Sequence, residues 1–255
     1  MLPYIVINMR FITNEPALFH KDALIIGDTH FGIEDKLKLK GIYQGNFTDL
    51  IVDKIKKLIR MTKAKKLIIL GDVKENITMV DEKTKIALQE LQETVDVTVV
   101  RGNHDGGIET ICNDVKPSDG YIYQNLGLVH GHSWPSEEIM NCDYLISAHQ
   151  HPQIEFIDKS GKRHVETAWL VLPANKTNLK KFYKKFNEKL QLILMPSFNP
   201  LAGKTLKYDE NEHLGPLFKN KLFKYNDAIS YRLNGVCIGR LRDHIVSSKS
   251  SINRS

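Results

Sequence analysis

Three short hydrophobic runs in the first half of the chain, at 23–26, 67–70 and 97–100, are each followed closely by a glycine and then by Asp or Asn. Apolar runs of this length, of which only the third contains a polar residue, Thr98, predict strands buried on both faces, and the glycine predicts a tight turn at the carboxyl end of each strand. Because such ends meet at one edge of an open α/β sheet, we expect the polar residues behind them to lie together.

Two segments between these runs have helical periodicity. The first starts near Asn46, and its outward face is basic, most simply a solvated surface; the second covers 81–94. The apolar positions of the two segments are Leu50, Ile51, Ile55, Leu58 and Ile59, and Ile86, Leu88 and Leu91. The alternation of strand, helix, strand, helix and strand predicts the α/β class.

After residue 105 the pattern changes to short strands joined by turns, which predicts a second, largely antiparallel sheet. The expected strands are 121–123, 126–130, 144–147, 154–158, 165–172 and 191–195. A helix rich in lysine and aromatic residues is expected at 178–188. We expect one domain over 1–246, with a Lys-rich helical excursion at about 174–189 and a disordered polar tail at 247–255.

Composition changes this picture little. The chain has 255 residues, 42% of them apolar and 26% charged, which suits a globular domain. Its formal charge of +6 favours an anionic partner, phosphate above all, although a general lysine bias would give the same charge. The three cysteines have no paired spacing and are expected to be reduced thiols. Because the sequence contains no run of about 18 apolar residues, we expect a cytoplasmic protein and no membrane partner.

Candidate metal ligands follow the predicted apolar strands in both halves of the chain. They are Asp28, His30, Asp72, Asn103, His104, His130, His149 and His151. A single histidine after a strand is usually a structural residue, but so many such residues are hard to explain as independent accidents. Carboxylates and imidazoles without thiolates suit Mn, Fe or Zn better than a thiolate zinc site or a calcium cage. The sequence predicts a centre with two divalent metal ions, for which Mn is preferred and Fe, Zn or Ni are alternatives.

The same residues form blocks that resemble those of the calcineurin-like metallophosphoesterases. The family blocks are D-x-H, G-D-x-x-D, G-N-H-D or G-N-H-E, a lone H, and G-H-x-H. The matching blocks here are Asp28-Thr29-His30, Gly71-Asp72-Val73-Lys74-Glu75, Gly102-Asn103-His104-Asp105, His130 and Ala148-His149-Gln150-His151. The resemblance spans about residues 23–152. It departs at Glu75, where the family has Asp, and at Ala148, where it has Gly.

The resemblance implies a two-sheet sandwich flanked by helices, in α-β-β-α layers. It also implies a ligand set, in which one metal ion is held by Asp28, His30 and His151, the other by Asn103, His130 and His149, and both by Asp72. The implied reaction is in-line hydrolysis of a phosphoester by a hydroxide that bridges the two ions. By analogy His104 either protonates the leaving oxygen or stabilises the phosphoryl charge, and Asp105 either orients the His104 ring or is a turn residue.

Two further stretches, 27–34 with Gly41 and 192–203, look like the SbcD-related phosphoesterases of archaea and the bacterial ligase-associated DNA-repair endonucleases. They favour a nuclease-like phosphodiesterase acting on DNA. The alternatives are a phosphodiesterase of small or cyclic nucleotides, a phosphomonoesterase, and a metal-free scaffold of the same fold that binds proteins. The sequence leaves the oligomeric state open.

Three features near these blocks permit two interpretations each. His132 either touches the substrate phosphate or has a supporting or surface role. Trp134 either packs as a lid residue or stacks against a base. In the segment 180–186, lysines and aromatic residues alternate, so it is either a surface that follows a nucleic-acid strand or an amphipathic helix whose Phe182 and Phe186 are buried.

Overall fold

The computed structural model describes residues 9–43, 45–157, 160–202 and 215–244, so the predicted tail at 247–255 lies outside the described residues. The three buried runs form parallel neighbouring strands of a six-stranded sheet, whose strands follow chain order. The strands are β1 (Met9–Phe11), β2 (Leu18–His20), β3 (Ala23–Ile26), β4 (Lys66–Leu70), β5 (Asp96–Val100) and β6 (Val115–Lys116). The carboxyl ends of β3, β4 and β5 therefore lie at one edge, as the sequence predicts.

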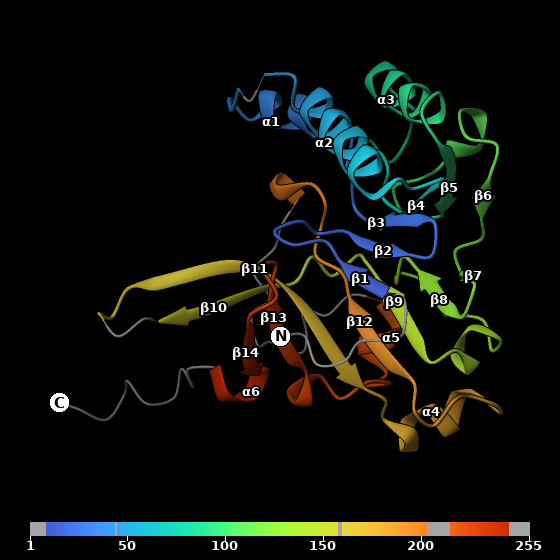
Figure 1. Ribbon diagram of the computed structural model, residues 1–255, viewed down its shortest axis with the longest axis vertical. Helices are drawn as coiled ribbons and strands as arrows, with labels where there is room; N and C mark the ends of the chain where they lie inside the picture. Colours follow the sequence, from blue (N-terminus) through green and yellow to red (C-terminus); the bar gives the residue numbers. More distant parts are fainter. Residues whose placement is uncertain (1–8, 44, 158–159, 203–214, 245–255) are drawn as a thin grey trace.

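Helices α1 (Ile33–Leu39), α2 (Phe47–Thr62) and α3 (Glu82–Gln92) cover one face of this sheet (Figure 1). The α3 helix starts where the Asp81 side chain accepts a hydrogen bond from the Thr84 amide at 2.9 Å, a typical N-cap. The predicted apolar faces are wrong at Leu50 and Ile86, which are 60% and 48% exposed. Both lie outside the narrower stripe that each helix presents to the sheet.

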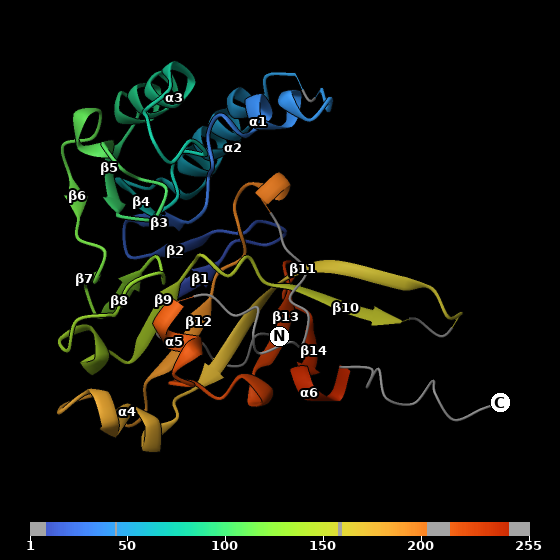
Figure 2. The ribbon, with the colours of Figure 1, turned by 180° about the vertical axis from the view of Figure 1, so that it is seen from behind.

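The second half of the chain forms the second sheet, in the order β14-β13-β11-β12-β9-β8-β7, with β10 paired to β11. Its strands are β7 (Tyr121–Tyr123), β8 (Leu126–Val129), β9 (Tyr144–Ser147), β10 (Gln153–Ile157), β11 (Arg163–Pro173), β12 (Gln191–Leu194), β13 (Ile229–Arg232) and β14 (Cys237–Arg240). All neighbours are antiparallel except β8–β9 and β9–β12. β10 and the start of β11 extend from the body as a two-stranded arm (Figures 1 and 2).

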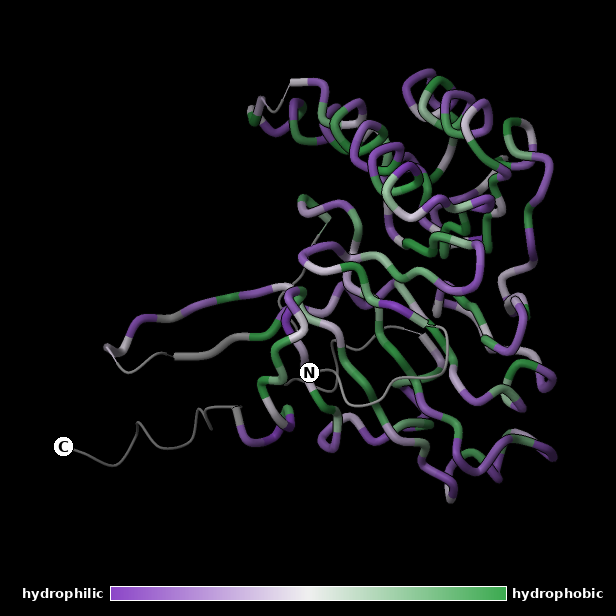
Figure 3. The backbone as a smooth tube through the Cα atoms, in the orientation of Figure 1, coloured by the Kyte–Doolittle hydropathy of each residue, from purple (hydrophilic) through white to green (hydrophobic). Residues whose placement is uncertain are grey.

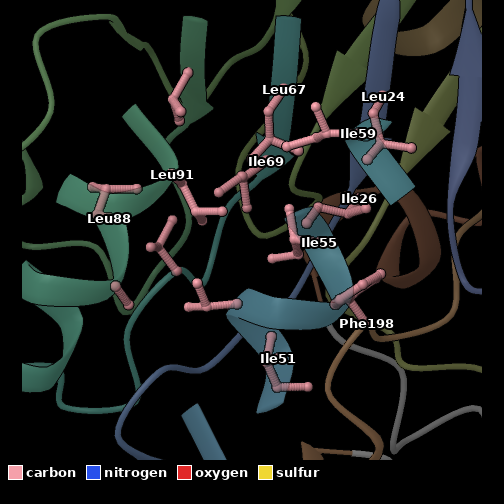
Figure 4. Packing of buried hydrophobic residues seen from close by; sticks show 14 of the residues in the cluster. Leu24, Ile26, Ile51, Ile55, Ile59, Leu67, Ile69, Leu88, Leu91 and Phe198 are labelled. Atoms are coloured by element: carbon pink, nitrogen blue, oxygen red, sulfur yellow. The ribbon is translucent and has the colours of Figure 1, made fainter. Parts of the chain in front are cut away.

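Side chains that alternate along the buried strands build separate layers of core. On β3, Leu24 and Ile26 pack against α2 and α3, in the cluster that Figure 4 shows. Between them Ile25 points the other way, into a core shared with Ile146 and Trp169 of the second sheet. Because both faces of these strands are covered, their sequences are continuously apolar rather than alternating. Figure 3 shows this as hydrophobic colour along the central strands, with hydrophilic residues on the outer turns of the helices.

The outer face of the second sheet carries the remaining core. Leu170 and Leu192 of the sheet pack there with Leu179 and Leu217. These last two belong to short helices, which with the C-terminal α6 are α4 (Lys176–Phe182), α5 (Gly215–Lys219) and α6 (Leu241–His244). The result is the predicted order of layers, helices, sheet, sheet and helices. Among the described residues, no helix is both long and apolar enough to cross a membrane.

The predicted helix at 178–188 is wrong in extent, because α4 ends at Phe182. Tyr183 has extended backbone angles, with φ −122° and ψ 128°, and its side chain is buried. Phe182, which one of the two interpretations of this segment places on a buried stripe, is 47% exposed, and Phe186 is partly buried. Burial of the Tyr183 ring, whose hydroxyl donates a hydrogen bond to the Pro135 carbonyl at 3.0 Å, thus prevails over the local tendency to continue the helix.

Candidate metal centre

The loops that follow β3, β4 and β9 are joined directly to one another. The Asp28 amide donates to the Gly71 carbonyl at 3.1 Å, and the His30 amide donates to the Asp72 carbonyl at 2.9 Å. From the second sheet, the His149 amide donates to the Asp28 carboxylate at 3.1 Å. These hydrogen bonds bring polar side chains from both sheets to the edge where the sequence predicts them.

Backbone strain is concentrated at this edge. Ten non-glycine residues in the described part of the chain have positive φ, and five of these are candidate ligands: Asp28, His30, Asp72, His149 and His151, with φ between 43° and 71°. A left-handed conformation costs an L-residue about 1–3 kcal/mol, and strain of this kind collects at functional sites. The surrounding structure holds these five residues in place against that cost.

The candidate ligands form three overlapping groups of donor atoms, and the atoms within each group lie within 4.8 Å of one another. The groups are Asp28 with His30 and His151, His30 with Asp72 and His104, and Asp72 with His130 and His149. Asp72 belongs to two of them and lies centrally. Its Oδ1 is 3.4 Å from His130 Nε2, and its Oδ2 is 3.8 Å from His30 Nε2.

The ring of His130 is oriented by the backbone. Its Nδ1 lies 2.8 Å from the Leu70 carbonyl, which can only accept, so Nδ1 carries the hydrogen and Nε2 faces Asp72. The same Nε2 lies 3.1 Å from Asn103 Oδ1. Burial disfavours the charged ring, but the hydrogen bond and charge of Asp72 outweigh burial and raise the pKa of His130 to about 9. The site therefore attracts positive charge.

His30 and His151 have their outer nitrogens held by other groups. His30 Nδ1 lies 2.8 Å from Glu75 Oε2, and His151 Nδ1 is hydrogen-bonded to the Ala202 carbonyl. Although burial alone raises the pKa of Glu75, its contacts with His30 and Lys36 hold it at about 2. The Nε2 atoms of both histidines are buried and make no well-aligned hydrogen bond, although that of His151 lies 3.3 Å from Asp28 Oδ1. Unpartnered imidazole nitrogens that face carboxylates fit a site for metal cations.

His104 and Asp105 have different environments. His104 Nδ1 lies 2.9 Å from the Glu75 carbonyl, and its Nε2 is 4.0 Å from Asp72 Oδ2, so the ring faces the site. The Asp105 carboxylate accepts hydrogen bonds from the amides of Val73 and Gly102, at 2.8 and 2.7 Å. Burial raises the pKa of Asp105. These contacts favour the turn interpretation of Asp105, since the Glu75 carbonyl orients the His104 ring.

The sequence model of the calcineurin-like phosphoesterase family matches residues 22–170 of this chain. The chain belongs to this family. It is therefore a hydrolase of phosphoester bonds, and the predicted family and two-sheet fold are confirmed. The family implies divalent metal ions, and the side-chain groups described above could bind them.

Two solved structures are similar to this chain at low sequence identity, and the first of them, with a TM-score above 0.5, shares its fold. The nuclease MPE of Pseudomonas putida is 17% identical, with a TM-score of 0.55, and the alignment covers 89% of this phosphoesterase and 98% of that chain. YfcE, a phosphoesterase from E. coli, is 14% identical with a TM-score of 0.41, covering 86% of this chain and 97% of that one. A comparison with curated proteins finds no match.

A distant segment of the phosphoesterase, 197–199, holds the first ligand loop in place. Ser197 Oγ donates to the Asp28 carbonyl at 3.1 Å, and Asn199 Nδ2 donates to the Thr29 carbonyl at 2.9 Å. Both side chains are buried. The sequence assigns them no role, because about 170 residues separate the partners. Their only signal is that they belong to the stretch 192–203 of the narrower resemblance.

Two glycines allow the ligand loops to approach closely. A Cβ added to Gly102 would lie 2.2 Å from the Asp72 amide nitrogen, and one added to Gly71 would lie 2.6 Å from Gly102 Cα. Since real Cβ atoms are not found so close to backbone, a larger residue at either position must displace a loop.

We expect Gly102→Ala to lower the free energy of unfolding by about 1–3 kcal/mol, because overpacking forces the Asp72 loop to move. The matched control is Gly106→Ala, whose Cβ would lie 3.4 Å from its nearest neighbour, the Ile77 carbonyl oxygen. That change should stay within about 0.5 kcal/mol. Urea denaturation of the two variants measures both values, and equal stability would show that the loop tolerates the methyl group.

Proposed function

We propose that this phosphoesterase hydrolyses phosphodiester bonds with two bound divalent metal ions. Asp28, His30 and His151 would hold one ion, and Asn103, His130 and His149 the other, with Asp72 contributing to both. The observation that carries the proposal is the three overlapping groups of donor atoms, in each of which the atoms lie within 4.8 Å of one another. Mixed carboxylate and imidazole donors suit Mn, Fe or Zn, and Mn is the ion that we propose first. Ions held there would lower the pKa of a water and neutralise charge on the phosphoryl oxygens.

His104 is the proposed general acid. Its Nδ1 hydrogen is directed at the Glu75 carbonyl, which leaves Nε2 directed into the site. The protonated ring would donate the Nε2 hydrogen to the leaving oxygen of the substrate. The His104 amide also donates a hydrogen bond to Asp72 Oδ1 at 2.9 Å. This bond holds the backbone of His104 next to the central carboxylate. Asp105 supports this loop through Val73 and Gly102.

Nucleic acid, and DNA in particular, is the proposed substrate. The basic charge of the chain, the stretches that resemble SbcD-related enzymes and the name of the P. putida neighbour, a nuclease, support this choice. Small or cyclic nucleotides and phosphomonoesters are the alternative substrates. A metal-free scaffold is disfavoured, because a protein without metals has no use for buried, unpartnered nitrogens on His30 and His151.

We expect protein stripped with a chelator to be inactive and to regain activity with Mn²⁺. Restored protein should hydrolyse bis(p-nitrophenyl) phosphate faster than p-nitrophenyl phosphate, because the proposed substrate is a diester. The release of p-nitrophenol measures both rates. Preference for the mono-ester would favour a phosphomonoesterase, and absence of bound metal and of activity would favour the scaffold.

A further inference from the structure

Most of the net charge of the protein lies in one short segment. Residues 176–189 contain six lysines and one glutamate, a net charge of +5, whereas the whole chain carries +6. All six lysines are exposed. Lys176 pairs with the single glutamate, Glu188, at 3.1 Å, and Lys181 donates to the neutral Asn178 side chain. The segment is therefore a concentrated cationic surface on a chain whose other charges nearly balance.

Two large aromatic side chains lie exposed beside these lysines. Trp134 is 42% exposed and Phe182, the last residue of α4, is 47% exposed. Their ring centroids are 5.0 Å apart, with 39° between the ring planes. Together they present adjoining apolar surfaces to solvent, next to positive charge. A polyanion that carries flat aromatic rings complements both properties.

Two hydrogen bonds join the chain segments that carry the aromatic pair. The buried Tyr183 donates its hydroxyl hydrogen to the Pro135 carbonyl at 3.0 Å, and burial raises its pKa to about 12, which keeps the hydroxyl protonated. The Lys185 amide donates to Glu137 Oε1 at 2.7 Å. These two hydrogen bonds join the residues that follow Trp134 to the residues that follow Phe182. The surface is therefore formed before any ligand binds.

Trp134 follows a residue that lies beside the metal centre. The His132 ring lies 5.2 Å from that of His130 and 6.1 Å from that of His149, centroid to centroid. His132 Nδ1 is buried without a hydrogen-bond partner. Trp134 is two residues further along, so its Cα lies within about 7 Å of that of His132. A strand whose phosphate reaches the centre thus has Trp134 within reach of a neighbouring base.

We propose that Trp134 and Phe182 stack against the bases of a single-stranded nucleic acid, while the lysines of 176–189 contact its phosphates and lead it to the metal centre. This inference rests on the proposed phosphodiesterase function and adds the form of the substrate. Stacking accepts any base but requires an exposed ring face, which a base-paired duplex does not offer except at its ends. We therefore infer a preference for single strands over duplex.

Intrinsic fluorescence offers a direct test, because the chain has two tryptophans and the other, Trp169, is buried at 1% exposure. We titrate chelator-treated full-length protein with a single-stranded oligothymidylate, under conditions in which no hydrolysis occurs. Stacking should quench the Trp134 emission and leave that of Trp169. The Trp134→Phe variant should lose the quenching but still bind the oligonucleotide, since phenylalanine keeps an aromatic face.

Further variants test the two parts of the surface separately. Phe182→Ala should weaken binding by about 5- to 150-fold, the range for one stacked base. Replacing Lys180, Lys181, Lys184 and Lys185 together by alanine should flatten the dependence of affinity on salt. The matched control replaces Lys57 and Arg60, exposed on α2, by alanine, and should leave affinity and salt slope unchanged.

Binding without quenching, quenching that survives Trp134→Phe, or unchanged affinity in Phe182→Ala would overturn the inference. Equal affinity for a blunt-ended duplex would also overturn it. Hydrolysis of bis(p-nitrophenyl) phosphate by the wild-type protein is measured on the same preparation with Mn²⁺ added. That reaction uses a small diester and tests the phosphodiesterase function alone, so failure of the stacking surface and failure of the proposed function give different results.

Discussion

Asp72→Asn should almost abolish turnover, by more than about 10³-fold, and reduce the bound metal. Removal of an outer partner of a metal ligand already costs 10–100-fold, and Asp72 is a proposed ligand of both ions. Its two oxygens lie 3.4 Å from His130 Nε2 and 3.8 Å from His30 Nε2, so one substitution affects both groups. Burial alone would raise the pKa of Asp72, but its contacts with His130 and His30 outweigh burial, and the net effect is a lowered pKa. The carboxylate therefore keeps its negative charge.

Metal content per chain and kcat on the bis-ester measure the effect of Asp72→Asn. Asparagine keeps the shape of the side chain, and circular dichroism should show a folded protein. Asp53→Asn, an exposed aspartate on α2, is the matched control and should change neither quantity. Two ions per chain and a normal rate in Asp72→Asn would refute the central position of this carboxylate.

His104→Ala should lower kcat by about 10²–10⁴-fold while both metal ions remain bound. The loss should depend on the leaving group, because p-nitrophenolate leaves without a proton whereas a nucleoside oxygen requires one. We therefore expect a large defect on a dinucleotide and a smaller one on bis(p-nitrophenyl) phosphate. Steady-state rates on the two substrates measure the difference.

An equal defect on both substrates would instead indicate that His104 stabilises phosphoryl charge, the other role that the sequence allows. Loss of metal from His104→Ala would mean that the proposed ligand set is wrong. The geometry allows this outcome, because His104 Nε2 lies 4.0 Å from Asp72 Oδ2, and His104 forms with His30 and Asp72 one of the three groups that could bind a metal ion.

Much of the fold could be predicted because its strands are buried on both faces. Covered faces on β3, β4 and β5 require runs that are apolar apart from the buried Thr98 of β5, and such runs are easily recognised in a sequence. The same topology explains why residues behind these runs meet at one edge. The left-handed angles of Asp28 and His30 could not be predicted, because positive φ is uncommon for any non-glycine residue, even for Asp and His, which adopt it more often than most.

Contacts between distant segments account for the features that were missed. In the sequence Glu75 is only a departure from the family block, whereas in the structure its carboxylate contacts both His30 and Lys36. Lys36 lies on α1, a short, mostly polar helix that the hydrophobic pattern does not reveal. The end of α4 at Phe182 likewise depends on the buried Tyr183 and its bond to Pro135, which local propensity does not contain.

An anomalous difference map from crystals grown with Mn²⁺ would locate the metal ions of the proposed two-metal centre. We expect two peaks about 3.5–4 Å apart, as in other two-metal sites. One peak should contact Asp28, His30 and His151, the other Asn103, His130 and His149, and Asp72 should contact both. A single peak, or peaks away from these side chains, would contradict the proposed metal centre.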